Sequence, residues 1–352
     1  MDTNDDSQSA IASGAHNSPS GESMSSMEHS AGASHTGLDL ISVQLARVEE
    51  TLLDLPDLKP AELRRAVEAI VRSGGKRFRP SIALLVGAML DANDDRLIDL
   101  ASAVEMLHTA TLVHDDLIDG SLVRRGTSTL NAVWTPAATV LTGDYLFAVA
   151  AGLAARTHNV RVISIFADTL GVIVAGELQQ QFTVWAQRST RDDYFRRIYA
   201  KTASMFVLAA TAAGVLAGAS ESQAAALNDY GRDLGLAFQI MDDVLDFTGD
   251  EAAVGKPVGG DLRRGVITLP TIFYAESHAR DELVECALQG NCEPSAYDEL
   301  VRRIRNSSAM DSAMQEAGRI ANHAKRALSI FPDNPHRATL LKLADYTLQR
   351  DK

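Results

Sequence analysis

The sequence predicts an all-α protein built as a single large helical bundle. Apolar side chains recur with the 3.6-residue period of an α-helix in two long stretches. They stand at Leu100, Val104, Leu107 and Thr111 in the first stretch, and at Leu234, Phe238, Met241 and Leu245 in the second. The alternating pattern of a half-buried strand, bounded by hairpin turn residues, is essentially missing. Ala- and Leu-rich segments joined by short breaks complete the pattern of a bundle.

The composition narrows the class of protein. The chain has 352 residues, 46% of them apolar and 22% charged, and 33 Lys and Arg against 46 Asp and Glu give a formal net charge of −13. This is ordinary globular composition, with enough length for a large core. The excess of acids argues against a nucleic-acid partner, which needs clustered Lys and Arg. Two cysteines, Cys286 and Cys292, are too few for a disulfide framework and fit a reducing compartment, the cytoplasm.

Residues 1–37 predict a disordered tail ahead of one folded domain, residues 38–352. The tail is rich in Ser, Gly, Ala, Asn and His, and the first basic side chain of the chain is Arg47. A secretory signal needs a basic start and an apolar run, and a transit peptide needs arginines, so neither is predicted. The tail has too few apolar side chains to form a core.

From residue 38 on, helical segments alternate with breaks rich in Gly, Pro, Asp and Asn. The breaks fall at Pro56–Pro60, Gly74–Gly75, Asp91–Asp95, Gly120–Pro136, Gly249–Gly265, Gly290–Pro294 and Pro332–Pro335. Between two of them, residues 202–220 carry no charge and approach the length of a membrane span. Much of this run is Ala, Thr, Ser and Gly, so we interpret it as a buried core helix. The protein is therefore not predicted to span a membrane.

Two acidic motifs with the same spacing are the strongest functional signal. They are Asp115-Asp116-Leu-Ile-Asp119 and Asp242-Asp243-Val-Leu-Asp246. Residues three and four apart share a helix face, so each motif places three carboxylates together. Burying them unpaired would cost several kcal/mol, so a cation must compensate their charge. Mg²⁺ prefers such oxygen ligands together with substrate phosphates, and Mn²⁺ is the alternative ion.

The flanking residues distinguish these motifs from a solvated acidic surface. The run Asp91-Ala-Asn-Asp94-Asp95 is typical of a loop. The two motifs instead stand in apolar sequence, TLVHDDLID and FQIMDDVLDF. Because acids among core-like residues more often line a cavity than face water, we predict that all six aspartates bind metal.

Four basic segments accompany the acidic motifs. They are Gly74–Pro80 (GGKRFRP), Arg124-Arg125-Gly126, Lys201-Thr202 and Gly255-Lys256-Pro257. Arg binds diphosphate oxygens bidentately, and Lys adds a point charge. Neither Gly-Lys pair is a P-loop, because Ile70 and Asp250 replace the leading Gly and no Ser or Thr follows. Together the motifs predict two bound diphosphate groups, one held through metal and the other mainly by Arg and Lys.

The motifs and their order resemble the trans-polyprenyl diphosphate synthases over roughly residues 38–350. The matching segments are GGKRFRP, HTATLVHDDLID, RRG, KT, GLAFQIMDDVLD and GKP. The resemblance implies the isoprenoid synthase fold, a single all-α bundle around a deep apolar cavity, usually as a homodimer. It implies a trans-prenyltransferase that joins isopentenyl diphosphate head-to-tail to an allylic diphosphate and releases pyrophosphate. It also implies roughly three Mg²⁺ ions per active site.

The resemblance gives each matching residue a role. Among the six aspartates, the expected direct Mg²⁺ ligands are Asp115, Asp119 and Asp242. The isopentenyl diphosphate pocket would contain Lys76, Arg79, His108 and Arg125. The allylic diphosphate pocket would contain Arg124, Lys201, Thr202, Gln239 and Lys256. Catalysis would rest on Asp115, Asp116, Asp119, Arg124, Lys201, Asp242 and Lys256. His108 stands two helical turns before Asp115 on the same face, so its proximity is physically sensible.

One position departs from the family pattern. Many members have Lys after the Gly of a GKxTLP segment, but this chain reads Gly265-Val266-Ile-Thr-Leu-Pro. One cation at the allylic diphosphate is then lost unless Arg263 or Arg264 substitutes.

Product length is predicted from the residues that precede the first acidic motif. Ala110 and Thr111 stand five and four residues before Asp115, one turn deeper along the helix, with Met106 another turn below. Large aromatic residues there would close the cavity beneath the growing tail, but these are small or flexible. We therefore expect a long-chain product, such as a quinone side chain, with peripheral membrane contact for its release. The small residues could instead serve helix packing alone.

Four other functions are alternatives to a long-chain synthase. A shorter-chain synthase would share every motif. A class I terpene cyclase handles one diphosphate and normally lacks a second DDxxD motif. A non-catalytic partner subunit of a heteromeric synthase tends to lose the acidic motifs, and both are intact here. A purely structural metal-binding protein would not need the basic segments.

Overall fold

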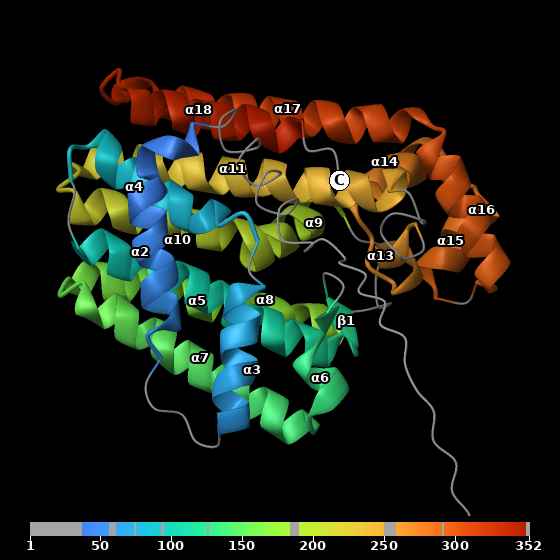
Figure 1. Ribbon diagram of the computed structural model, residues 1–352. Coiled ribbons are helices and arrows are strands. Elements are labelled where there is room, and N and C mark those ends of the chain that lie inside the picture. Colours follow the sequence, from blue (N-terminus) through green and yellow to red (C-terminus); the bar gives the residue numbers. More distant parts are fainter. Residues whose placement is uncertain are drawn as a thin grey trace, which may run out of the picture.

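The computed structural model describes residues 37–55, 61–73, 75–92, 95–124, 127–183, 190–249, 258–290 and 292–349, and this part of the chain is almost entirely helical (Figure 1). The predicted all-α class is therefore confirmed. The N-terminal half contains η1 (Leu38–Ile41), α2 (Ser42–Leu53), α3 (Ala61–Arg72), α4 (Phe78–Met89), α5 (Asp95–Ile118), α6 (Leu130–Val133), α7 (Pro136–Arg156) and α8 (Val160–Thr183). The predicted tail, residues 1–37, lies outside the described residues except for Gly37.

The C-terminal half continues the helical pattern. Its elements are α9 (Arg191–Ile198), η2 (Tyr199–Ala203), α10 (Ser204–Leu216), α11 (Glu221–Thr248), α13 (Gly260–Arg263), α14 (Leu269–Ser277), α15 (Glu282–Leu288), α16 (Pro294–Arg305), α17 (Ser308–Ala327), η3 (Leu328–Ile330) and α18 (Pro335–Leu348). Two short strands, β1 (Val123–Arg124) and β2 (Thr127–Ser128), pair antiparallel inside the predicted break Gly120–Pro136.

The long helices lie side by side, and α10 and α11 run through the middle of the bundle (Figure 1). α11 packs against α10 and α17, α10 packs against α4, α5 and α8, and α5 packs against α7. Buried apolar side chains form two clusters, one around α4, α5, α7 and α10, the other around the C-terminal half of α11 with α14 to α17. The first acidic motif ends α5, and the second lies near the end of α11. The two motifs therefore belong to different parts of the core.

α10 confirms that the uncharged run is a buried core helix, because all its residues from Ser204 to Gly214 are buried. By length and composition alone, three stretches could cross a membrane: Pro136–Arg156, Val160–Phe182 and Arg191–Leu216. The third contains α10, and 78% of its apolar window is buried inside the protein, against 39% for the first and 22% for the second. α7 and α8 therefore leave apolar side chains on the surface, which the sequence pattern did not predict.

Two glycines let neighbouring helices approach η2 closely. A Cβ at Gly235 of α11 would lie 2.5 Å from Ala203 Cα, and a Cβ at Gly176 of α8 would lie 2.5 Å from Ala200 Cβ. Glycine inside a helix costs roughly 1 kcal/mol relative to alanine, which the close packing offsets. Both α11 and α8 are thereby held against η2, the segment that contains Lys201.

The two cysteines of the chain lie close together. Cys286, in α15, and Cys292, just before α16, form a disulfide. Their Cα atoms are 5.2 Å apart, a normal separation for a disulfide. A single bridge between residues six apart is still no disulfide framework.

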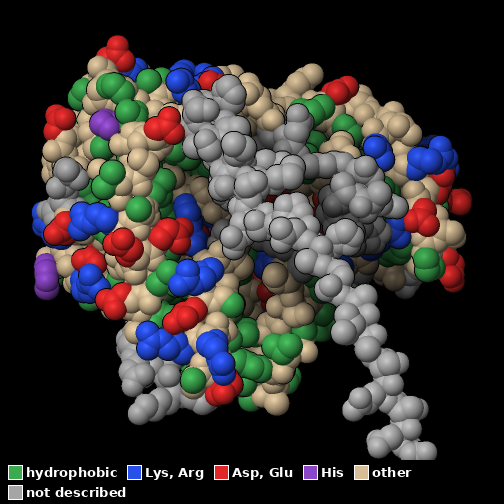
Figure 2. Space-filling view, in the orientation of Figure 1, with side chains coloured by type: hydrophobic (Ala, Val, Ile, Leu, Met, Phe, Trp, Pro, Cys, Tyr) green, Lys and Arg blue, Asp and Glu red, His purple; other side chains and the backbone are tan. Residues whose placement is uncertain are grey.

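The surface mixes charges of both signs. Figure 2 shows Lys and Arg side chains interspersed with Asp and Glu over the visible face. Several are paired, for example Arg161 with Glu221 and Arg191 with Glu276. Such exposed pairs contribute little to stability because water screens them.

Candidate active site

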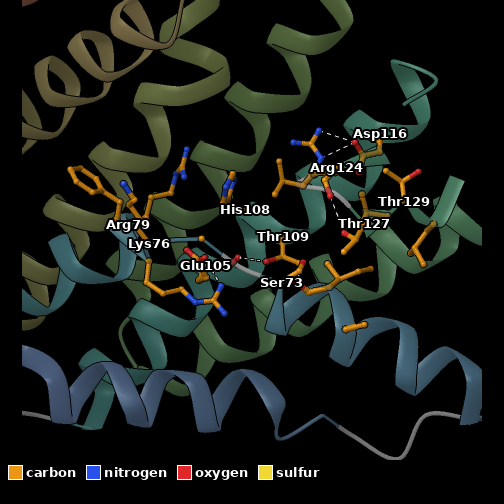
Figure 3. A pocket seen from close by; sticks show the side chains of 18 of the residues that line it. Ser73, Lys76, Arg79, Glu105, His108, Thr109, Asp116, Arg124, Thr127 and Thr129 are labelled. Atoms are coloured by element: carbon orange, nitrogen blue, oxygen red, sulfur yellow. Dashed lines mark hydrogen bonds and ion pairs between the residues drawn. The ribbon is translucent and has the colours of Figure 1, made fainter. Parts of the chain in front are cut away.

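Two cavities meet the C-terminal end of α5. The larger, of about 550 Å³, is lined among others by Lys76, Arg79, His108, Asp116 and Arg124, and we call it the basic pocket (Figure 3). The smaller, of about 160 Å³, is lined among others by Asp119, Lys201, Gln239, Asp243 and Asp261, and we call it the acidic pocket. The first acidic motif thus contributes one aspartate to each pocket.

The GGKRFRP segment forms one wall of the basic pocket. Arg77 adopts a left-handed backbone, with φ of 48°, directly before α4 begins. Its buried guanidinium donates to Glu105 Oε1 at 2.7 Å and to both carboxylate oxygens of Glu49. Arg77 therefore anchors the turn, while Lys76 and Arg79 on either side of it lie at the pocket (Figure 3). The three neighbouring basic residues thus differ in their partners.

Aromatic side chains position the cations of the basic pocket. Lys76 Nζ donates to Tyr346 Oη at 2.6 Å and lies 5.3 Å from the centre of that ring. The Arg79 guanidinium carbon lies 5.1 Å from the centre of the Phe206 ring. His108 lines the same pocket from α5. The structure thus brings together the predicted residues Lys76, Arg79 and His108, whereas Arg125 lies outside the described residues.

The first acidic motif occupies the last turn of α5, where carboxylates face the unfavourable negative end of the helix dipole. Asp116 is buried and accepts from Arg124 Nε of β1 at 2.8 Å. Burial raises the pKa of Asp115 to about 6, against the lowering effect of the Lys201 ammonium. Asp119 follows the helix and its N–H donates to Asp115 O at 2.8 Å. Cations of the chain itself therefore compensate this motif.

The second acidic motif accepts its hydrogen bonds from neutral donors, with the charges of Arg197 and Arg264 nearby. Asp243, only 4% exposed, accepts from Tyr194 Oη at 2.7 Å and from Gln239 Nε2 at 2.9 Å. Burial raises the pKa of Asp243 to about 7, although both donors lower it. Asp246 accepts from the backbone N–H of Asp261 at 3.2 Å, and burial together with the Asp261 charge raises the pKa of Asp246 to about 6. Asp242 is partly buried on the same turn of α11.

Lys201 lies on η2, a one-turn π-helix between α9 and α10. Such turns often occur at functional sites because they displace one side chain from the regular helical ladder. Lys201 Nζ lies 2.9 Å from Glu177 Oε1 and 3.9 Å from Asp115 Oδ2. Burial opposes the charge, but the carboxylates of Asp115 and Glu177 raise the pKa of Lys201 above its ordinary value. The lysine is therefore a fixed cation at the acidic pocket.

A hydrogen-bond chain joins η2 to the second acidic motif. Thr202 Oγ1 donates to Gln239 Oε1 at 2.6 Å, and Gln239 Nε2 donates to Asp243 Oδ1 at 2.9 Å. Gly235 stands one helical turn before Gln239, and its contact with Ala203 sets the spacing. The predicted residues Lys201, Thr202 and Gln239 are thus brought to one place.

The segment after α11 resolves the question raised by Val266, which itself lines the acidic pocket. Arg263 turns away and pairs with Asp298. Arg264 lines the acidic pocket, where it lies 2.6 Å from Asp261 Oδ1. Of the two arginines considered, Arg264 is therefore the one placed to supply a cation. The predicted residue Lys256 lies outside the described residues.

The donor chemistry of the acidic pocket fits a hard divalent ion. Within the described ranges, no three Asp, Glu, His or Cys side chains converge as a ready-made metal cluster. The six aspartates thus do not form a preassembled cage. Burial raises the pKa values of three carboxyl groups of the two motifs, Asp115, Asp243 and Asp246, so a bound cation would stabilise their charged forms. Mg²⁺ suits such a site because it takes one or two carboxylates and completes its shell with water and phosphate oxygens.

The residues predicted to set product length lie in the core. Met106 and Ala110 are fully buried, and Thr111 is nearly so, with its hydroxyl donating to His108 O at 2.8 Å. None of the three is among the described residues that line the basic or the acidic pocket. Their role in product length stays a prediction.

Several residues at the site were missed by the sequence analysis. They are Glu177, Gln180, Tyr194, Arg197, Asp261 and Tyr346. Glu177 and Gln180 had a signal, because the polar run GELQQQ interrupts a long apolar helix. Tyr194 and Tyr346 had none, since their partners are 49 and 270 residues away in the sequence.

Comparison with known proteins agrees with this geometry. The family model for polyprenyl synthetases matches residues 60–304. The octaprenyl diphosphate synthase of Haemophilus influenzae is 39% identical over 80% of this chain and 86% of its own length. That of Escherichia coli is 34% identical over 89% of this chain and 98% of its own length.

Solved structures show the same fold. The decaprenyl diphosphate synthase from Rhodobacter capsulatus matches with a TM-score of 0.83 and 33% identity, over 91% of this chain and 98% of that one. A polyprenyl synthase from Caulobacter crescentus, complexed with calcium and isoprenyl diphosphate, matches with a TM-score of 0.82 and 36% identity, over 90% and 97% of the two chains. The predicted isoprenoid synthase fold is therefore confirmed, and the chain belongs to the polyprenyl synthetase family.

Proposed function

We propose that this chain is a trans-prenyltransferase that joins isopentenyl diphosphate head-to-tail to an allylic diphosphate and releases pyrophosphate. The observation that carries the proposal is the pair of pockets at the end of α5, one lined by basic residues and one by acidic residues. Two anionic substrates that must react with each other need two such sites in contact. A terpene cyclase, which handles one diphosphate, would not need the separate basic pocket.

In this proposal the basic pocket binds the diphosphate of isopentenyl diphosphate. Lys76 and Arg79 supply the positive charge, with His108 as a further donor and Arg125 as the remaining predicted residue. Tyr346 and Phe206 fix the two cations, so less side-chain freedom is lost on binding. The apolar part of the pocket wall, which includes Ile70, Leu112 and Val133, accommodates the isopentenyl carbons.

The acidic pocket binds the allylic diphosphate together with Mg²⁺, and we propose three ions per site, with Mn²⁺ as the alternative. When bound, the metal acts as a Lewis acid on the departing pyrophosphate. Lys201 and Lys256, with Arg124 from the wall of the basic pocket, add fixed positive charge where negative charge develops. The apolar core around the site excludes water, which would otherwise capture the allylic cation. Thr202 and Gln239 orient the aspartate carboxylates through their hydrogen bonds.

The product is a long-chain all-trans polyprenyl diphosphate of the kind used for quinone side chains. Its relatives carry the names octaprenyl, solanesyl and decaprenyl diphosphate synthase. In this chain Ala110 and Thr111 would let the growing tail pass between the helices. Ala110→Phe should therefore shorten the product, and an unchanged product length would contradict the role of this position. Because Ala110 is fully buried, the variant's thermal stability must be measured alongside.

We also propose that the enzyme is a homodimer. α7 and α8 pack against each other and expose large apolar side chains, among them Leu141 at 67% and Phe182 at 84% exposure. A second copy covering this face would remove that surface from water. Sedimentation should give twice the monomer mass, and Leu141→Glu with Phe182→Glu should halve it. A monomeric wild-type protein at micromolar concentration would contradict the proposal.

The enzyme is placed in the cytoplasm, where its charged substrates are soluble, with peripheral membrane contact when the product leaves. Cell fractionation checks this placement, and recovery of the protein outside the cytoplasm would contradict it.

The decisive experiment is incubation with labelled isopentenyl diphosphate and, separately, dimethylallyl, geranyl, farnesyl and geranylgeranyl diphosphate. Chromatography then resolves the products by length. The proposal predicts Mg²⁺-dependent formation of long chains. Products that stop at farnesyl or geranylgeranyl length would support the shorter-chain alternative. No elongation with any primer would favour a non-catalytic partner subunit and overturn the proposal.

A further inference from the structure

We propose that Glu177 is a positioning residue that holds the Lys201 ammonium away from Asp115, so that Asp115 stays open to metal. The inference rests on the proposed function of the acidic pocket. It concerns a carboxylate outside both acidic motifs, on a helix to which the sequence analysis gave no role.

The backbone brings Glu177 to Lys201. Gly176 of α8 lies against Ala200 of η2 so closely that a Cβ at this glycine would be 2.5 Å from Ala200 Cβ. The next residue on each element is Glu177 and Lys201. Because the two backbones approach at the preceding position, the two side chains meet, and Glu177 Oε1 lies 2.9 Å from Lys201 Nζ.

The lysine is shared unequally between two carboxylates. Its Nζ is 2.9 Å from Glu177 but 3.9 Å from Asp115, so the hydrogen-bonded partner is Glu177. Both carboxylates are largely buried, with 16% and 17% of their side chains exposed. Without the Glu177 charge, the ammonium would move toward the remaining carboxylate and form a direct ion pair with Asp115. That ion pair would compete with metal for the same oxygens.

Glu177 acts through Lys201 and not through the ligand. Lys201 lines the acidic pocket, whereas Glu177 is not among the described residues lining either pocket. If Glu177 acted only through its negative charge, its removal would change diphosphate binding in the opposite direction from a loss of positioning. Removing a negative charge near an anion site should by itself strengthen diphosphate binding. Loss of positioning should weaken metal-dependent binding instead, and only while Lys201 is present.

The test is a double-mutant cycle of Glu177→Gln and Lys201→Gln in the full-length chain. Calorimetry measures the binding of inorganic pyrophosphate with Mg²⁺, and steady-state kinetics give KM for the allylic and isopentenyl substrates. Partners that orient a metal ligand typically contribute about 10- to 100-fold in affinity. Glu177→Gln should therefore weaken Mg²⁺–pyrophosphate binding by about tenfold or more, and raise KM for the allylic substrate but not for isopentenyl diphosphate. In the Lys201→Gln background the same change should have little effect.

Two controls keep the result interpretable. Glu221→Gln removes a carboxylate from an exposed ion pair with Arg161 and should leave binding unchanged. Glu177→Asp keeps the charge and should restore part of the binding. Equal loss with and without Lys201, or unchanged binding in Glu177→Gln with an unchanged melting temperature, would overturn the inference. Failure of the wild-type enzyme to elongate any primer would instead overturn the proposed function.

Discussion

The two acidic motifs have the same spacing, yet their surroundings differ. Asp115 and Asp116 lie beside the cations Lys201 and Arg124. Asp243 lies against a phenol and an amide, and Asp246 against a backbone N–H. The first motif is thus paired with cations, whereas the hydrogen bonds of the second come from neutral donors, with the charges of Arg197 and Arg264 nearby. Two identical sequence motifs need not have the same electrostatic environment, because their interaction partners come from distant parts of the chain.

This difference suggests a division of labour. Neutral donors orient the carboxylates of the second motif, and the pKa values of Asp243 and Asp246 stay raised despite the charges of Arg197 and Arg264, so this motif favours an external cation. In the first motif, Arg124 pairs with Asp116 and Lys201 lies near Asp115, so both cations stand beside the carboxylates and can contact a diphosphate bound there. The second motif would then anchor metal, and the first would couple metal binding to the substrate.

Removing a metal-binding aspartate from either motif should have the largest effect on turnover. Asp115→Ala and Asp242→Ala are each expected to lower kcat by orders of magnitude while the helical fold is retained, since in the proposed function both motifs hold the same metal–diphosphate group. Asp333→Ala, at an exposed carboxylate far from the pockets, serves as the control. Near-normal turnover of either motif variant in excess Mg²⁺ would show that one motif suffices.

Removing a neutral donor from the second motif should have an intermediate effect. Tyr194→Phe deletes the hydroxyl that orients Asp243, and outer partners of metal ligands typically contribute about 10- to 100-fold in affinity. We expect the Mg²⁺ concentration for half-maximal turnover to rise about tenfold. Tyr274→Phe removes the same atom opposite Asp281, outside the site, and should leave the Mg²⁺ requirement unchanged. An equal response of both variants would contradict the role of Tyr194.

The smallest effect is expected in the pH dependence of stability. Burial raises the pKa of Asp243 to about 7 in the folded protein, from an ordinary value of 3.8 for a solvated aspartate. The stability that the protonated group contributes is fully present below pH 3.8 and is lost as the pH rises through about 7. The metal-free protein should therefore lose thermal stability relative to Asp243→Asn between about pH 5 and 8. A melting-temperature difference that is constant across this range would contradict the buried, uncompensated carboxylate.

The sequence predicted what depends on local spacing. The helical class, the buried run in α10 and the position of each acidic motif at a helix end follow from short-range patterns. The resemblance to a known family supplied Lys201, Thr202 and Gln239. Neither local spacing nor the resemblance predicts contacts between residues far apart in the sequence, so Tyr194 and Tyr346 were not predicted. The π-turn that aims Lys201 and the close approach at Gly176 also escaped, since each depends on the packing of three helices.

In the proposed site, both motifs bind one diphosphate through metal ions. Calorimetric titration of inorganic pyrophosphate, with and without Mg²⁺, into the wild-type protein and into Asp115→Ala and Asp242→Ala tests it most directly. Tight Mg²⁺-dependent binding to the wild type, with comparable losses in the two variants, is the predicted result. Full-strength binding to either variant, or binding that ignores Mg²⁺, would contradict it.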